Sequence, residues 1–113
     1  MCGICGIINF NQRPVDKHIL EKMSNALVHR GPDSQGFFIK NNVGLGHRRL
    51  SIIDLETGGQ PIYNEGRSLC LIFNGEIYNF RELRRELEKK GHVFRTQGDA
   101  EVIVHLYEQY SHV

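Results

Sequence analysis

The sequence predicts an α+β fold with a largely antiparallel sheet. Short apolar segments of strand length recur along the chain, and turns rich in Gly, Pro and Asn separate them. Three longer segments show the apolar spacing of amphipathic helices. Hairpin turns join consecutive strand segments, and this order favours antiparallel pairing with helices on the sheet.

The first half of the chain is expected to form a strand, a helix and a hairpin. Residues 3–10 are apolar and β-rich, and Asp16 can cap a helix that runs to about position 29. Gly, Pro and Asp in residues 30–36 end that helix. Two further strands are expected at 37–40 and 43–54, joined at Asn41-Asn42.

The second half begins with a loop over 56–66 and an apolar strand over 69–73, followed by short strands at 76–78 and 93–95. Between these short strands, Asn79 and Glu82 resemble a capping box that opens a helix to position 90, and Gly91 ends it. A last helix follows Asp99, and its apolar face is expected to be Val102, Ile103, Leu106, Tyr107 and Tyr110.

Composition excludes several functional classes. The chain has 113 residues, the length of one domain. Its 14 Lys and Arg against 13 Asp and Glu give a net charge of +1, which argues against a nucleic-acid or membrane-surface partner. No apolar run approaches the ~18 residues of a membrane span, and the apolar start lacks the basic flank of a signal peptide. The chain is therefore expected to be cytoplasmic.

Cys2 follows the initiator methionine, and we expect Met1 to be removed because Cys is small. The exposed α-amine would then have a pKa of about 7.7–8.0 against about 8.5 for the thiol, so proton transfer from sulfur to nitrogen is nearly balanced. One residue would thus supply nucleophile and base together.

Two other interpretations of this cysteine stay open. Cys2 and Cys5 have C-x-x-C spacing, which occurs in zinc and redox sites. Zinc would need two further ligands, and only Cys70 and scattered histidines are present. The six histidines show no ligand spacing, so no metal ligand is assigned. A terminal cysteine is also often just a small hydrophobe.

Asn74-Gly75 is a strong hairpin signal between apolar segments. The same pair can form an oxyanion hole, because the Asn amide and the next backbone N–H are donors and Gly permits close approach.

Other polar residues have a structural and a functional interpretation. Arg48 and Arg49 fall on opposite faces of one strand, so one can face solvent and the other can pair with a substrate carboxylate. Asp99 is more often a helix cap than a ligand, and Glu76 can be a plain surface carboxylate.

Several motifs together resemble a known family. They are CGICG (2–6), RGPD (30–33), GHRRLSIID (46–54), GGQPIYNE (58–65), FNGEIYN (73–79), GHVF (91–94) and GDAEVI (98–103). In this order they resemble the class II glutamine amidotransferase domain, and most of all that of glutamine-hydrolysing asparagine synthetases. The resemblance covers nearly the whole chain.

The resemblance implies an N-terminal nucleophile hydrolase fold, a four-layer αββα sandwich, and hydrolysis of L-glutamine to glutamate and ammonia. Cys2 would be the nucleophile, and Asn74 and Gly75 would form the oxyanion hole. The substrate would be bound by Arg49 at its α-carboxylate, by Glu76 and Asp99 near its α-amine, and by the backbone of Leu50, Ser51, Ile52 and Ile53.

The resemblance also implies that residues 1–113 are the N-terminal portion of the amidotransferase domain, which continues in family members beyond Val113. The synthetase domain that would use ATP and Mg²⁺ to make asparagine is not in this chain, so no cofactor is expected here. Expected partners are glutamine, a synthetase domain in the complete enzyme and, in an oligomer, a second copy as a homodimer. The alternatives are a catalytically silent fragment or interaction module, an ammonia donor to another acceptor, and a C-x-x-C metal or redox protein.

Overall fold

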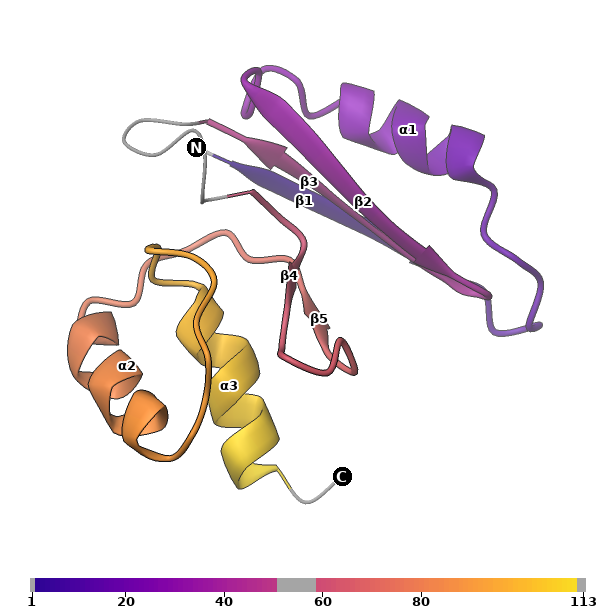
Figure 1. Cartoon of the computed structure of the whole chain (residues 1–113). Helices are drawn as coiled ribbons and strands as arrows, with labels where there is room; N and C mark the ends of the chain where they lie inside the picture. The colour runs from indigo at the N-terminus through magenta and orange to yellow at the C-terminus, as the bar shows by residue number, and fades with distance from the viewer. Residues whose placement is uncertain (1, 51–58, 112–113) are drawn as a thin grey trace.

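The computed structural model describes residues 2–50 and 59–111 as an α+β arrangement with antiparallel strand pairing. Figure 1 shows two parts: a long sheet with one helix along it, and a smaller group of two helices beside a short hairpin. Within the described ranges, no helix combines the length and apolar character needed to cross a membrane.

The first sheet consists of β1 (Gly3–Ile8), β2 (Ser34–Lys40) and β3 (Val43–Arg49) in the order β1-β3-β2. Both pairings are antiparallel, with Gly3 opposite Arg48 and Ser34 opposite Arg49. As predicted, β2 and β3 are joined at Asn41-Asn42, where Asn41 has a φ of 53°. Strand β3 ends at Arg49, and residues 51–54 of the predicted 43–54 strand lie outside the described residues.

Helix α1 (Lys17–Asn25) lies along this sheet (Figure 1). The Asp16 carboxylate accepts a hydrogen bond from His18 N–H at 2.9 Å, so the predicted cap is confirmed. The helix ends four residues earlier than expected, and turns follow it. Leu20 is fully buried, and a Cβ on Gly44 would lie only 3.2 Å from its Cδ2, so the glycine allows helix and sheet to approach closely.

The second part contains β4 (Ile62–Tyr63), β5 (Cys70–Leu71), α2 (Phe80–Lys89) and α3 (Glu101–Tyr110). Ile62, Ala100 and Val104 form its small core, against which Leu71 and Phe73 pack. Both helices were predicted correctly, and Gly91, with a φ of 97°, follows the end of α2.

Several expectations for this half were wrong. Residues 76–78 and 93–95 are not strands, and β4 lies inside the expected 56–66 loop. The Asn79 side chain makes no capping hydrogen bond. On α3 the buried face includes Glu101 and His105 beside apolar residues, while Tyr107 and Tyr110 are exposed. In the segment where a strand was expected at 93–95, backbone N–H groups bond to carboxylates instead of to a neighbouring strand. Glu65 accepts from Val93 N–H, and Glu101 accepts from the N–H groups of Arg95 and Thr96.

Candidate functional site

Cys2 lies at the N-terminal end of β1, just before Gly3. Because Gly3 pairs with Arg48 in an antiparallel register, Cys2 falls level with the end of β3. There the Leu50 N–H donates a hydrogen bond to the Cys2 sulfur at 3.5 Å. A Cβ on Gly3 would lie 3.3 Å from the Leu27 side chain, so this strand end is tightly held.

Two side chains from distant segments fix the Cys2 backbone. The Asn74 side-chain amide donates to the Cys2 carbonyl at 3.0 Å, and Arg30 Nε donates to the same oxygen at 3.2 Å. The structure therefore brings the predicted nucleophile, one predicted oxyanion-hole donor and the predicted Leu50 backbone together. A hydrogen-bonded carbonyl with two donors leaves the nucleophile little freedom to move.

The segment that carries Asn74 is fastened at Phe73. The Gln60 side chain both accepts from Phe73 N–H at 2.6 Å and donates to Phe73 O at 3.0 Å. Nε2 of His47, from β3, lies 3.2 Å from the same carbonyl. A Cβ on Gly75 would lie 2.8 Å from the Phe73 ring, so any larger residue would push the ring or the loop away.

Burial is the main cause that lowers the pKa of His47, and the positive charge of Arg49 adds to it. The hydrogen bond to Phe73 opposes this shift without cancelling it. His47 is therefore neutral near pH 7. Its Nε2 must carry the hydrogen, because the Phe73 carbonyl can only accept.

The two adjacent arginines have different surroundings, as their positions on one strand predicted. Arg48 is buried and donates to the Ser24 carbonyl and hydroxyl at 3.2 Å and to Asn25 Oδ1 at 2.7 Å. It therefore holds α1 against the sheet. Arg49 is half-buried at the end of β3, and continuing the register of β1 and β3 places it opposite Cys2. Arg49 therefore lies on the same face of the sheet as Cys2, and Arg48 lies on the other face.

Asp99 does not cap α3. The residue at the N-cap position is Ala100, and the Asp99 carboxylate accepts from Ile77 N–H at 2.7 Å instead. The expectation of a helix cap was wrong, because the carboxylate serves the loop after β5. This contact brings Asp99 to the segment that contains Glu76, whose side chain is exposed. Ser51, Ile52 and Ile53 lie outside the described residues.

The hairpin interpretation of Asn74-Gly75 was also wrong. Among the described residues after Gly75, up to position 111, no strand is present, and neither Asn74 nor Gly75 has the positive φ that an Asn-Gly hairpin turn requires. Cys2 and Cys5 are free thiols, and burial raises the pKa of Cys5. Within the described ranges, the one cluster of three or more potential metal ligands contains no cysteine.

Sequence reasoning missed three residues that position the site: Arg30, His47 and Gln60. Arg30 was visible in the RGPD motif, but a Gly-Pro pair points first to a turn. Nothing local marked His47 or Gln60, because their partner is a backbone carbonyl 26 and 13 residues away.

Comparison with known proteins matches the chain to one family over its whole length. The family described as "Glutamine amidotransferase domain" matches residues 1–113. The chain is 49% identical to asparagine synthetase [glutamine-hydrolyzing] 1 of Bacillus subtilis (strain 168), which aligns with 97% of this chain and 18% of that protein. A second enzyme of that organism, asparagine synthetase [glutamine-hydrolyzing] 2, is 47% identical over 96% of this chain and 15% of its own length.

A plant relative is similar to the same degree. Asparagine synthetase [glutamine-hydrolyzing] 1 of Arabidopsis thaliana is 43% identical over 97% of this chain and 19% of that protein. The chain thus spans less than a fifth of the length of these relatives. The match over all 113 residues, together with the assembled ends of β1 and β3 and the Asn74 segment, shows that the chain belongs to the glutamine amidotransferase domain family.

Proposed function

We propose that this domain hydrolyses the side-chain amide of L-glutamine with Cys2 as the nucleophile. The observation that carries the proposal is the hydrogen bond from Asn74 to the Cys2 carbonyl, across 72 residues of sequence. It brings a neutral N–H donor next to the residue whose sulfur would attack, and this proximity supports an oxyanion hole that includes Asn74. The Gly75 backbone N–H is the second proposed donor.

The proposed reaction proceeds in two halves. The Cys2 sulfur bonds to the amide carbon of glutamine while its proton passes to the α-amine of the same residue. The carbon–nitrogen bond then breaks, the amine returns the proton to the leaving nitrogen, and ammonia departs. Water attacks the resulting thioester, releases glutamate and restores the thiol.

Substrate binding is assigned to residues around this sulfur. Arg49 would pair with the α-carboxylate through its planar guanidinium, and Glu76 and Asp99 would bind the α-amine. The backbone of residues 50–53 would line the side of the pocket. The contact between Asp99 and the loop after β5 supports this assignment, because it brings α3 next to Glu76.

The proposal extends to the complete protein. The names of the relatives support delivery of the ammonia to an asparagine-forming domain, with ATP and Mg²⁺ bound there rather than in residues 1–113. We place residues 1–113 in the N-terminal portion of an N-terminal nucleophile hydrolase sandwich, and the protein in the cytoplasm. The helix-covered antiparallel sheet supports that architecture.

The test is covalent trapping with a diazoketone analogue of L-glutamine, followed by peptide mass spectrometry. The analogue should modify Cys2 and leave Cys5 unmodified, and Cys2→Ala should abolish labelling while Cys5→Ala retains it. Cys5 is a matched control because it lies three residues away in the same strand. The D-enantiomer should react far more slowly. Equal labelling by both enantiomers, or no labelling of Cys2, would favour a catalytically silent module.

A further inference from the structure

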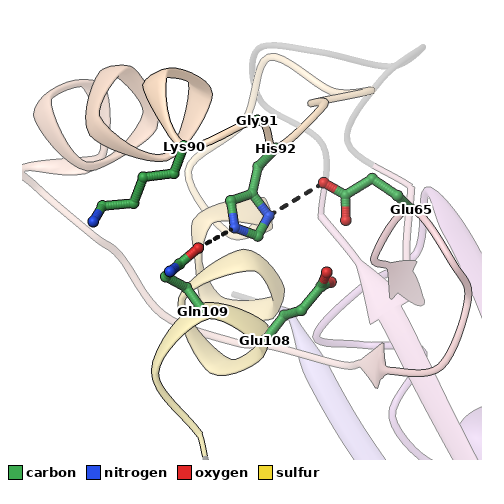
Figure 2. Close-up of a pocket in the computed structure, with 6 residues that line it drawn as sticks. All are labelled: Glu65, Lys90, Gly91, His92, Glu108 and Gln109. Carbon is green, nitrogen blue, oxygen red and sulfur yellow. Dashed lines mark hydrogen bonds and ion pairs between the residues drawn. The ribbon is translucent and has the colours of Figure 1, made fainter.

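A histidine–carboxylate cluster lies apart from the residues assigned to glutamine. It consists of Glu65, His92, His105 and Glu108, and its potential ligand atoms all lie within 4.8 Å of one another. Glu65 follows β4, His92 follows α2, and the other two lie on α3. Glu65, His92 and Glu108 also line an open hollow of about 420 Å³, and Figure 2 shows these three side chains around it.

His105 is the central residue of this cluster. It is fully buried, and its Nε2 lies 2.9 Å from the carboxylate of buried Glu101. This contact places the hydrogen of a neutral ring on Nε2, so that Nδ1 presents a lone pair to the cluster. Nδ1 has no hydrogen-bond partner, although it lies 3.2 Å from Glu65 Oε1. A lone pair facing a carboxylate is unfavourable unless a cation lies between them.

His92 repeats this arrangement from the other side. Its Nδ1 also lies 3.2 Å from Glu65 Oε1, and its Nε2 contacts Gln109 Oε1 at 2.9 Å (Figure 2). Metal-bound histidines in proteins likewise hold their outer nitrogen through a carboxylate or an oxygen. In a tetrahedral zinc site with bonds of about 2.0–2.1 Å, neighbouring ligand atoms are about 3.3 Å apart. The distances from Nδ1 of His92 and of His105 to Glu65 Oε1, 3.2 Å each, are close to that spacing.

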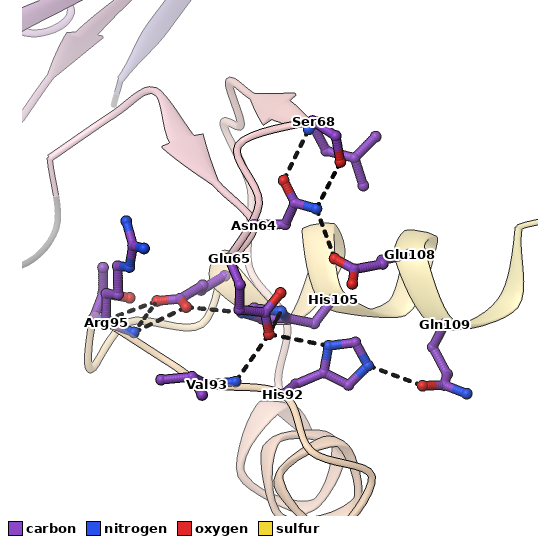
Figure 3. Close-up of polar contacts among 12 residues, drawn as sticks. Asn64, Glu65, Ser68, His92, Val93, Arg95, His105, Glu108 and Gln109 are labelled. Carbon is purple, nitrogen blue, oxygen red and sulfur yellow. Dashed lines mark hydrogen bonds and ion pairs between the residues drawn. The ribbon is translucent and has the colours of Figure 1, made fainter.

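The charges of the cluster also favour a cation. Glu65 Oε1 accepts a hydrogen bond from Val93 N–H at 2.9 Å, and Glu65 Oε2 is a buried atom without a hydrogen-bond partner. Glu108 accepts from Asn64 at 2.6 Å through one oxygen (Figure 3). The nearest lysine at the hollow, Lys90, has its ammonium over the Tyr110 ring.

We propose that Glu65, His92 and His105, with Glu108 as the fourth ligand, bind a divalent transition-metal ion of the zinc class. Two imidazoles and two carboxylates are suitable ligands for Zn²⁺. Glu101 would be the outer partner that orients His105. The ion would join α3 to the segments that follow β4 and α2, and thus brace the smaller part of the fold. The proposal is independent of glutamine hydrolysis, and it differs from the expectation that no histidine is a metal ligand.

The test measures binding of Zn²⁺ alone to the 113-residue chain by titration calorimetry in a buffer that does not chelate metals. One equivalent should bind. His92→Gln should weaken binding about 10-fold or more, since even the loss of an outer partner costs about 10- to 100-fold in metal affinity. Glu108→Gln keeps an oxygen for Asn64 and serves as a second variant if His92→Gln does not fold. His18→Gln, on the exposed face of α1, is the matched control and should bind as the parent does.

Substitution with Co²⁺ identifies the ligands. Coordination by imidazole and carboxylate should give visible d–d bands without the intense sulfur charge-transfer bands of thiolate ligands. Those sulfur bands would instead assign the ion to Cys2 and Cys5 and overturn the proposal. Absence of stoichiometric binding would also overturn it. Equal affinity in the parent, His92→Gln and Glu108→Gln would do the same.

Discussion

The side-chain amide of Asn74 donates to the backbone carbonyl of Cys2, with a nitrogen–oxygen distance of 3.0 Å. Neither residue could be paired with the other from local sequence, because 72 positions separate them. Through this contact, an Asn-Gly pair whose sequence is typical of hairpins lies next to Cys2 instead of forming a hairpin turn.

Asn74→Asp should lower glutaminase turnover by about 100- to 1000-fold, because a negative charge would replace a donor beside the developing oxyanion. Asn74 is exposed, so the loss of its hydrogen bond to the Cys2 carbonyl should lower the free energy of unfolding by only about 0.5–1.5 kcal/mol. Asn79→Asp is a matched control, since Asn79 is exposed and makes no capping hydrogen bond. The assay is ammonia release in a version extended to the full domain. Wild-type turnover in a folded Asn74→Asp protein would leave Asn74 as a structural residue only.

Removal of Met1 should be required for reactivity of Cys2. With Met1 present, the Cys2 nitrogen is an amide without useful basicity, whereas the free amine has a pKa of about 7.7–8.0. Intact mass should show loss of Met1 in active material. Alkylation of Cys2 by iodoacetamide at pH 7 should be slower when Met1 is retained, and equal rates would exclude the single-residue base.

Arg49→Lys should impair glutamine binding, whereas Arg48→Lys should lower the stability of the fold. Lys at position 49 keeps the charge but loses the bidentate fork, so KM for glutamine should rise more than kcat falls. Lys at position 48 cannot reproduce the hydrogen bonds to Ser24 and Asn25 and should destabilise the fold by about 1.5–3 kcal/mol. Steady-state kinetics and urea unfolding of both variants separate these roles. An unchanged KM in Arg49→Lys would contradict carboxylate binding by Arg49.

Acid should destabilise the protein in two steps. Burial lowers the pKa of His47, so the unfolded state binds the proton more tightly and stability falls as pH drops below about 6.5. Burial tends to raise the pKa of Glu101, but its hydrogen bonds from His105, Arg95 and Thr96 lower it overall. The stabilisation that the ionised Glu101 carboxylate provides is therefore lost in a second step, as the pH falls below about 4.3.

Urea unfolding at several pH values can resolve the two steps. His47→Gln should remove the upper step, and Glu101→Gln the lower one. Glu101→Gln should also destabilise the protein at pH 7 by about 1–3 kcal/mol, because the charged acceptor of two backbone N–H groups is lost. A Glu101→Gln protein with the parent's acid profile would show that other groups set that step.

The sequence predicted most of the regular elements better than it predicted the contacts between distant segments. Apolar alternation and the Asp16 cap located β1 and α1, because those signals act within a few residues. Residues 93–96 escaped prediction for the opposite reason. Their backbone N–H groups bond to the side chains of Glu65 and Glu101 rather than to a strand, and no local pattern marks such partners. The buried His105 was missed because it occupies a helix position that apolar spacing assigns to the core.

The segments that meet at Cys2 have a consequence for synthesis. Cys2 is among the first residues to leave the ribosome, but the side chains that donate to its carbonyl, those of Arg30 and Asn74, are synthesised later. The loop after β5 in turn depends on Asp99, at the start of α3. Until Asn74 and Asp99 have been synthesised, a nascent chain therefore carries the Cys2 thiol without the contacts that hold it in the folded domain, and the site can assemble only after these segments have left the ribosome.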